Sequence, residues 1–437
     1  MRQISGSDRN GRDVRDEVEK VVLVGVNLSG RGGWFEEESL KELELLADTA
    51  GARVVASVIQ IRQTPDPAYY IGRGKAHEIK ELAERVEADL VVFDDDLSPA
   101  QARNLERMIQ KRVIDRSELI LDIFAQRART AQAKAQVELA QLQYLLPRLK
   151  RMWKHLSRIR GGIGLRGPGE TQLEVDRRVI KRKITDLKKR IARIEKVRHL
   201  QRQRRLEEFN VAIVGYTNAG KSTLFNRLTK GDAFVEDRLF ATLDATTRVV
   251  TVGRRKLLLT DTVGFIKKLP HHLVASFRAT LEEVVEADLL LHIIDSSHPE
   301  LEERLKTVDE VLGDLGVLAK PRIRVFNKID LISDKSQLVM LRETYPEGVF
   351  CSALNDELDE LTDALEARLT RREIIAEFLL PLEDHRGIAE ICRVGEIVSR
   401  ISENGLHRLR VKLKVEDRDR LLSRGFRGVG ESAKQDE

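Results

Sequence analysis

The sequence contains very little cysteine and no long apolar run. Only two of its 437 residues are cysteines, Cys351 and Cys392, and they lie far apart without the spacing of a CxxC or Cys/His metal motif. We therefore expect reduced thiols rather than a disulfide or a zinc site. The most apolar stretch, Ala287 to Ile294, has the length of a strand, whereas a membrane-spanning helix needs about 20 apolar residues. Residues 1–15 are polar and lack a signal-peptide core, so the sequence favours a cytoplasmic protein without membrane insertion.

One segment has the complete spacing of a phosphate-binding loop, G-x-x-x-x-G-K-S. The apolar run Asn210 to Val214 precedes it and predicts the strand that leads into such a loop. The glycines let backbone N–H groups surround phosphates, Lys221 would reach the β and γ oxygens, and the Ser222 hydroxyl would hold Mg²⁺. A chance glycine-rich turn is the alternative, and it is disfavoured because further nucleotide motifs follow in order. The residues predicted to contact the nucleotide are Gly215, Tyr216, Thr217, Asn218, Ala219, Gly220, Lys221 and Ser222.

A second phosphate element follows another apolar run, Lys256 to Thr260. Asp261 at its end would lie in the outer shell of the metal, and the N–H of Gly264 would contact the γ-phosphate. The residues of this element that we predict to contact the nucleotide are Asp261, Thr262, Val263 and Gly264. A threonine between the two elements must complete the metal shell. The candidates in that interval are Thr242, Thr246 and Thr247.

The motif at residues 327–330 indicates which base is bound. It follows the apolar run Ile323 to Phe326 and ends in Asp330. The Asp330 carboxylate can accept hydrogen bonds from both the N1–H and the exocyclic amine of guanine. Adenine does not present this pair of donors, and leaving a buried acceptor without a donor costs about 1 to 3 kcal/mol. The sequence therefore favours GTP and argues against an ATP-driven RNA-remodelling enzyme. The residues predicted to surround the base are Asn327, Lys328, Ile329, Asp330, Ser352, Ala353 and Leu354.

Positive charge is concentrated in one segment of the chain. The net charge is +5, but residues 126–206 contain 24 Lys and Arg against 6 Asp and Glu. Two series of apolar residues at heptad spacing flank the glycine-rich stretch 161–169. They predict two helices that pair as a long antiparallel hairpin, with a break at Pro147 because proline lacks an N–H. The series are Ala135, Leu139, Leu142, Leu146, Leu149, Trp153 and Leu156, and then Ile180, Ile184, Leu187, Ile191 and Ile194.

The tip of this hairpin, residues 158–178, combines glycines with five arginines and three acidic residues. A flexible basic loop at the end of a rod suits phosphate backbones and folded RNA, where shape and phosphate contacts dominate recognition. The alternative is a solvated coiled coil that only spaces two domains. The large charge excess and the glycine-rich tip favour RNA binding.

Residues 19–116 are predicted to form a small α/β domain, because β-type runs alternate with helical stretches. Its loop Gly72 to Lys75 lacks the G-x-G-x-x-G spacing, so we predict a turn that begins a helix rather than a second nucleotide site. Three aspartates, Asp94 to Asp96, could suggest Mg²⁺, but an acidic loop that caps the next helix is the preferred interpretation. The β-type runs are 20–27, 52–61 and 89–93, and the helical stretches are 36–49, 75–86 and 98–110.

The remaining segments complete an α/β fold class. Residues 1–18 are predicted to be disordered. The helical hairpin occupies residues 117–206, and a P-loop GTPase domain occupies residues 207–371. Residues 372–437 form a small C-terminal α/β appendage that ends in a polar tail from Gly428. We expect a monomer.

The combination of motifs closely resembles the HflX family of ribosome-associated bacterial GTPases. The resemblance covers about residues 20–370 and includes the phosphate loop, the basic hairpin tip and the loop Gly72 to Lys75. It implies a cytoplasmic GTPase that binds the large ribosomal subunit and its RNA through the N-terminal domain and the hairpin tip, with the tip near the peptidyl-transferase region. It also implies that the GTPase dissociates stalled ribosomes under stress.

The family similarity assigns roles inside the site. It selects Thr242 as the switch threonine, so that Ser222 and Thr242 would hold Mg²⁺, and it implies that Lys221, Thr242 and Gly264 act on the γ-phosphate. Related GTPases carry a water-orienting glutamine where this chain has Phe265, so we expect slow intrinsic turnover that ribosomes stimulate. The first-switch residues implied to contact the nucleotide are Phe240, Ala241, Thr242, Leu243 and Asp244.

A function of another class stays open at this stage. A non-ribosomal GTP-dependent scaffold could use the basic hairpin to bind an acidic protein or an anionic membrane. Membrane binding would require an apolar stripe beyond the heptad positions, and the sequence does not show one.

Overall fold

The computed structural model describes residues 18–28, 34–149, 172–203, 209–230, 239–240, 242–253, 255–268, 281–370, 373–403 and 405–429. The chain divides into two compact units. One unit consists of Met1–Val250 with Leu257–Asp356, and the other consists of Thr251–Lys256 with Glu357–Glu437. The predicted disordered N-terminus up to residue 17, the hairpin tip up to residue 171 and Ala241 lie outside the described residues.

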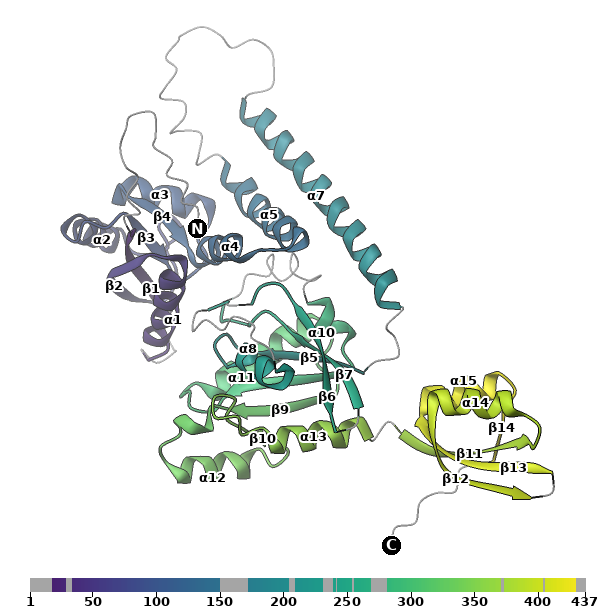
Figure 1. Cartoon of the computed structure of the whole chain (residues 1–437). Helices are drawn as coiled ribbons and strands as arrows, with labels where there is room; N and C mark the ends of the chain where they lie inside the picture. Colours follow the sequence, from purple (N-terminus) through teal and green to yellow (C-terminus); the bar gives the residue numbers. More distant parts are fainter. Residues whose placement is uncertain are drawn as a thin grey trace, which may run out of the picture. The chain divides into compact units, whose positions relative to one another are not determined.

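The first part of the chain forms the predicted α/β domain around a parallel sheet of order β2-β1-β3-β4. Its central strand β1 is buried on both faces: Val21 and Leu23 join one apolar cluster, and Val22 and Val24 join another. Such two-sided burial is expected of a parallel strand covered by crossover helices. Strand β4 was not predicted. The elements are β1 Lys20–Leu28, α1 Trp34–Ala50, β2 Arg53–Arg62, α2 Arg73–Arg85, β3 Leu90–Phe93, α3 Pro99–Ile109, β4 Arg112–Asp115 and α4 Arg116–Arg127 (Figure 1).

Two loops of this domain were interpreted from the sequence. Gly72 is the cap residue of α2, which confirms the predicted turn at the start of a helix. The prediction that the acidic loop caps α3 is wrong, because Ser98 caps that helix by accepting a hydrogen bond from the Gln101 N–H. A cap must directly precede the first helical turn, and Asp94 lies too early, at the end of β3. Within the described ranges, no group of three or more His, Cys, Asp or Glu side chains could hold a metal ion.

The basic segment forms the predicted antiparallel helix pair, α5 Ala131–Leu145 and α7 Gln172–Gln203 (Figure 1). The prediction of a loop up to residue 178 is wrong for residues 172–178, which form the start of α7. Apolar side chains of the two heptad series pack between these helices. Pro147 lies in a short 3-10 helix, η1 Leu146–Arg148, that directly follows α5, which confirms the predicted break. The packed side chains are Ala135, Leu139, Leu142, Ile184, Leu187 and Ile191.

The G domain is built on a six-stranded sheet of order β10-β9-β8-β5-β7-β6. The pairs β5 with β7, β5 with β8, β8 with β9 and β9 with β10 are parallel. The carboxyl ends of parallel strands meet at one edge of a sheet, where ligands of such folds bind. The phosphate loop, the element Asp261 to Gly264, the base motif and residues 352–354 each follow a strand at that edge, whereas the first switch precedes β6. The strands are β5 Phe209–Gly215, β6 Thr246–Val252, β7 Arg255–Asp261, β8 Leu289–Asp295, β9 Arg322–Asn327 and β10 Val349–Phe350.

The helices of this domain connect these strands along the chain. They include α8, which begins at Lys221 immediately after the phosphate loop. One apolar cluster contains residues of α1 and α4 together with Val214, Val263 and Phe265 of the G domain, so the two domains share buried apolar contacts. The helices are α8 Lys221–Thr229, α10 Glu282–Glu286, α11 Leu301–Asp314, η3 Ile329–Leu331 and α12 Lys335–Thr344.

The second unit contains an antiparallel sheet of order β12-β13-β11-β14 around a core that includes Phe378 and Ile391. Gly428 lies in β14 and pairs with Phe378, so the prediction that the polar tail begins at Gly428 is wrong. No described helix is long and apolar enough to cross a membrane. The elements are α13 Asp359–Thr370, β11 Glu373–Pro381, α14 His385–Val394, β12 Gly395–Glu403, β13 Leu406–Lys414, α15 Val415–Ser423 and β14 Arg427–Val429.

Candidate functional site

The nucleotide motifs surround a cavity of about 330 Å³ at the carboxyl edge of the G-domain sheet. Most of the lining residues were predicted from the sequence. Thr223 and Leu331 also line the cavity and were missed, although each directly follows a predicted motif. The lining residues are Thr217, Asn218, Gly220, Lys221, Ser222, Thr223, Phe240, Thr242, Thr262, Gly264, Asn327, Lys328, Asp330, Leu331, Ala353 and Leu354.

The phosphate loop requires its glycines for steric reasons. Gly215 has φ +151°, and a Cβ there would lie 2.3 Å from the carbonyl oxygen of Ile293. Gly220 has φ +91°, and a Cβ there would lie 2.2 Å from the side-chain nitrogen of Asn327. Other residues rarely adopt these conformations and would clash. The loop therefore closes against β8 and the base motif, as a phosphate cradle must.

Lys221 is the buried cation of this loop. Its Nζ donates a hydrogen bond to the carbonyl oxygen of Tyr216 at 2.7 Å. Burial, together with the charge of Lys328, lowers the pKa of Lys221 to about 8, although Asp261 opposes the shift. A desolvated ammonium gains from an anionic ligand, so the surroundings of Lys221 favour phosphate binding.

Three side chains meet where a metal ion would bind. The Ser222 Oγ lies 2.9 Å from the Thr242 Oγ1, and both hydroxyls donate to the Asp261 Oδ2, at 2.8 and 2.9 Å. The second oxygen of Asp261 is buried and has no hydrogen-bond partner among the described residues. Burial raises the pKa of Asp261 despite the nearby charge of Lys221. Hard oxygen donors around a carboxylate with an unsatisfied oxygen fit Mg²⁺.

The structure also separates the three candidate threonines. Thr242 lies with Ser222 and lines the cavity. Thr247 instead contacts the Thr260 hydroxyl at 2.9 Å, within the strand pair β6 and β7. Thr246 is exposed at the start of β6. The geometry therefore favours Thr242 as the switch threonine, in agreement with the family resemblance.

The second switch lies directly against the phosphate loop. A Cβ at Gly264 would lie 2.8 Å from the Lys221 Nζ, so only glycine allows this approach. The next residue, Phe265, exchanges backbone hydrogen bonds with the loop, donating to the Gly215 carbonyl at 3.1 Å and accepting from the Thr217 N–H at 2.7 Å. The Phe265 side chain is only 1% exposed and belongs to the apolar core. Its ring therefore does not reach the cavity.

The base motif is cross-linked to the other loops of the site. Asn327 donates to the Ala219 carbonyl at 2.9 Å and accepts from the Ala353 N–H at 2.9 Å, which joins the phosphate loop to residues 352–354. Asp330 accepts a hydrogen bond from the Ser352 hydroxyl at 2.5 Å, which orients its carboxylate beside the cavity. Lys328 forms an ion pair with Asp295 at 2.7 Å. These contacts fix the geometry with which Asp330 would read a base.

Several predicted residues support the site without lining its cavity. Gly215 and Ala219 contribute backbone contacts: the Gly215 carbonyl accepts the Phe265 N–H, and the Ala219 carbonyl accepts from Asn327. Leu243 and Val263 are buried in the apolar core. The predicted residues that do not line the cavity are Gly215, Tyr216, Ala219, Leu243, Asp244, Asp261, Val263, Ile329 and Ser352.

Tyr216 and Asp244 direct their side chains toward the N-terminal part of the chain. The Tyr216 hydroxyl donates to Glu42 of α1 and accepts the Lys267 N–H at 2.5 and 2.8 Å respectively. Asp244 accepts hydrogen bonds from the backbone N–H groups of Arg129 and Thr130 just before α5. Both residues lie inside nucleotide motifs, so the motifs themselves contact the N-terminal part.

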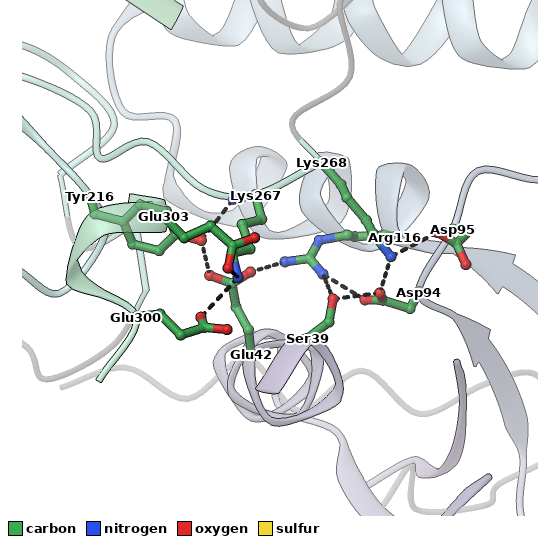
Figure 2. Close-up of polar contacts among 10 residues, drawn as sticks. All are labelled: Ser39, Glu42, Asp94, Asp95, Arg116, Tyr216, Lys267, Lys268, Glu300 and Glu303. Carbon is green, nitrogen blue, oxygen red and sulfur yellow. Dashed lines mark hydrogen bonds and ion pairs between the residues drawn. The ribbon is translucent and has the colours of Figure 1, made fainter. Parts of the chain in front are cut away.

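Tyr216 belongs to a polar cluster, named here the Arg116 cluster, that joins the α/β domain to the G domain (Figure 2). The cluster connects α1 and the ends of β3 and β4 with the phosphate loop, the end of the second switch and the start of α11. Its members are Ser39, Glu42, Asp94, Asp95, Arg116, Tyr216, Lys267, Lys268, Glu300 and Glu303.

The register of two neighbouring strands builds the centre of this cluster. Phe93 of β3 pairs with Asp115 of β4, so the next residues, Asp94 and Arg116, emerge side by side. The fully buried guanidinium of Arg116 donates to Asp94 at 2.5 Å and also contacts Glu42. Lys268 of the G domain forms ion pairs with Asp94 and its neighbour Asp95.

These charges compensate one another despite their burial. Burial acts to lower the pKa of Arg116, but the carboxylates of Asp94 and Glu42 outweigh it and raise that pKa. Burial acts to raise the pKa of Asp94, but Arg116 and Lys268 outweigh it and lower that pKa. Arg116 and Asp94 therefore stay ionised, and the α/β domain meets the second switch through the ion pairs of Lys268 with Asp94 and Asp95.

Comparison with known proteins agrees with this geometry. Residues 37–125, 127–205 and 210–328 match family models described as GTP-binding GTPase N-terminal, GTP-binding GTPase middle region and 50S ribosome-binding GTPase. A protein named GTPase HflX from Caldanaerobacter subterraneus is 46% identical over 412 residues, which cover 92% of this chain and 93% of that protein. The GTPase HflX of Escherichia coli is 43% identical, with 94% and 97% covered.

Solved structures give a weaker match. A GTP-binding protein from the archaeon Sulfolobus solfataricus in complex with GDP is 28% identical, with a TM-score of 0.42. The match covers 80% of this chain and 99% of that one.

Proposed function

Since the chain belongs to the HflX family of GTPases, we propose that it binds the large ribosomal subunit and uses GTP-dependent switching to dissociate or rescue stalled ribosomes under stress. The match of residues 210–328 to a family of 50S ribosome-binding GTPases supports this partner. A ribosomal partner would place the protein in the cytoplasm, where we propose that it acts as a monomer.

The observation that carries this proposal is the cation-rich surface of helix α7, which belongs to the same unit as the nucleotide cavity. Helix α7 buries an apolar stripe against α5 and exposes cations along the rest of its surface. Such a surface attracts RNA through its phosphates, with release of counterions. The exposed cations of α7 are Arg177, Arg178, Lys181, Arg182, Lys183, Lys188, Lys189, Arg190, Arg193 and Lys196.

The geometry of the site suggests how GTP is held and cleaved. Lys221 would contact the β and γ oxygens, and the Gly264 N–H would contact the γ-phosphate. Ser222 and Thr242 would hold Mg²⁺, with Asp261 orienting their hydroxyls. When bound, Mg²⁺ would neutralise charge that develops on the phosphate oxygens. Asp330 and residues 352–354 would select guanine, so the chain's own residues position the triphosphate for in-line attack by water.

We expect hydrolysis without ribosomes to be slow, because the Phe265 ring is buried and cannot orient water. Replacing Phe265 by Leu should lower the free energy of unfolding by about 1 to 2 kcal/mol. Turnover in the absence of ribosomes should stay within a few-fold of wild type. Single-turnover GTP hydrolysis and urea unfolding measure the two effects. If the Phe265→Leu variant stayed folded but lost most of its turnover, Phe265 would act on the reaction directly.

The hairpin tip provides the test of the ribosomal partner. Because α7 begins at Gln172, residues 158–171 can be replaced by a short neutral turn without shortening that helix. GTP affinity should stay unchanged, while ribosome affinity and ribosome-stimulated hydrolysis fall together. Each lost phosphate contact should also reduce the slope of log affinity against log salt by about 0.7 to 0.9.

A matched control neutralises three cations of a strand in the other unit. Replacing Arg408, Arg410 and Lys412 of β13 by Gln removes positive charge from the C-terminal sheet. Its ribosome affinity and salt slope should stay near wild type. Sedimentation through ribosome gradients with GTP, GDP and a non-hydrolysable analogue measures both variants. Unchanged binding, salt slope and subunit dissociation in the tip variant would leave the hairpin as a spacer.

A further inference from the structure

We propose that Asp244 is a positioning residue that couples the metal-binding threonine of the first switch to helix α5 of the basic hairpin. The inference rests on the proposed nucleotide site, in which Thr242 holds the metal, but it does not depend on the ribosome as partner. It assigns to Asp244 a role outside the nucleotide contacts that the sequence suggested.

The first observation is the set of hydrogen bonds that Asp244 accepts. Its Oδ2 accepts the backbone N–H groups of Arg129 and Thr130 at 3.0 and 3.1 Å, and its Oδ1 accepts the Thr130 hydroxyl at 2.5 Å. Thr130 is in turn the cap of α5, because its Oγ1 accepts the Ala133 N–H at 3.1 Å. The Thr130 hydroxyl therefore donates to the switch and accepts from the helix.

The charge of Asp244 also matches the helix that it contacts. The first turn of α5 contains no acidic residue. The amino end of a helix carries a partial positive charge and stabilises a nearby carboxylate. Asp244 supplies that negative charge from a segment 114 residues away in sequence. The switch thus provides a favourable interaction that α5 does not make within its own sequence.

A second attachment lies on the other side of Thr242. The ring of Phe240 packs edge-to-face on Phe124 of α4, with ring centroids 4.7 Å apart. Both rings are almost fully buried. Phe240 has a φ of +56°, which residues with a side chain seldom adopt unless their surroundings enforce it. The threonine is therefore flanked by two contacts with consecutive helices of the N-terminal part.

Movement of the switch must consequently affect α5. Only Leu243, which is buried in the core, separates Thr242 from Asp244. When the γ-phosphate and the metal fix Thr242, Asp244 is fixed two residues later, and with it the first turn of α5. When Thr242 is released, the Asp244 carboxylate is free to leave that turn. By linkage, any partner that shifts α5 should change the relative affinity for GTP and GDP.

Hydrogen exchange can test this coupling without ribosomes. In the full-length protein, amides of Arg129, Thr130 and the first turn of α5 should exchange several-fold more slowly with a non-hydrolysable GTP analogue than with GDP. In the variant Asp244→Asn, which keeps the shape but loses the charge, this difference between nucleotides should disappear. Affinity for the analogue should stay within a few-fold of wild type, because Asp244 does not line the cavity.

An aspartate that caps a helix in the other unit provides a matched control for Asp244→Asn. Asp384 caps α14 in the other unit by accepting the Gly387 N–H at 2.8 Å. The variant Asp384→Asn should keep the nucleotide-dependent exchange of α5. A purely structural role of Asp244 would raise exchange equally with both nucleotides and preserve their ratio, which would overturn the proposal. Equal exchange with both nucleotides in the wild-type protein would overturn it as well. Neither result bears on ribosome binding, which the tip variant tests.

Discussion

The variant Asp330→Asn is expected to lose most of its affinity for GTP and to bind xanthosine triphosphate instead. The carboxylate of Asp330 is oriented by the Ser352 hydroxyl and would accept two hydrogen bonds from guanine. Hydrogen bonds to a charged group are worth about 1.5 to 3 kcal/mol each, so losing both should weaken GTP binding by about 10²- to 10⁴-fold. An asparagine amide can instead donate to the O2 of xanthine. Calorimetric titration with the two nucleotides measures the change in preference.

A neighbouring aspartate supplies the control for this experiment. Asp334 caps α12 by accepting the Ser336 N–H at 2.8 Å and does not line the cavity. The variant Asp334→Asn should therefore keep its preference for GTP. If Asp330→Asn also kept that preference, the assignment of Asp330 to base recognition would be wrong.

The largest expected effect on stability comes from the Arg116 cluster. Replacing Arg116 by Met should lower the free energy of unfolding by about 3 to 5 kcal/mol, because removal of one partner leaves buried charge uncompensated. The side chain of Arg116 is 1% exposed, and that of its partner Asp94 is 0% exposed. Urea unfolding of the full-length protein, analysed by linear extrapolation, measures the loss.

Two further variants separate the contribution of buried charge to the free energy of unfolding from that of side-chain packing. Combining Arg116→Met with Asp94→Asn removes a charge of each sign and should recover part of the lost stability. Tyr216→Phe removes one hydroxyl and should cost about 1 to 3 kcal/mol, because the buried oxygen of Glu42 loses its donor. A loss below about 1 kcal/mol for Arg116→Met would mean that water or rearrangement satisfies Asp94 and Glu42.

The parts of the site that could be predicted from the sequence are contiguous motifs. The phosphate loop, Asp261 and Asp330 follow apolar strands, and parallel strands bring their carboxyl ends together whatever else the chain does. The antiparallel helix pair was also predictable, because apolar residues at heptad spacing lie on one face of a helix and are buried against the partner helix. Pro147 marked the end of α5, because proline has no backbone N–H to donate within a helix.

The side-chain directions inside those motifs could not be predicted. Tyr216 bonds to Glu42, which lies 174 residues earlier in the chain, and no local pattern identifies such a partner. Strand β4 has only four residues, and it is a strand because β3 lies beside it. The aspartates that follow β3 were predicted to cap a helix, but Asp94 instead forms ion pairs with Arg116 and Lys268. In each case, a contact with a residue distant in sequence determines the structure, and the local sequence does not identify that residue.

Because α7 is long, a small tilt at its contact with α5 moves its end by a larger distance. With 32 residues at about 1.5 Å each, the helix is about 48 Å long. A displacement of 1 Å across an interaxial spacing of about 10 Å tilts a helix by about 6°. The Gln172 end of α7 lies about 22 Å from Leu187, which packs against α5. The same tilt therefore moves that end by about 2 Å, so a shift of α5 is about doubled at the end of α7 that adjoins the hairpin tip.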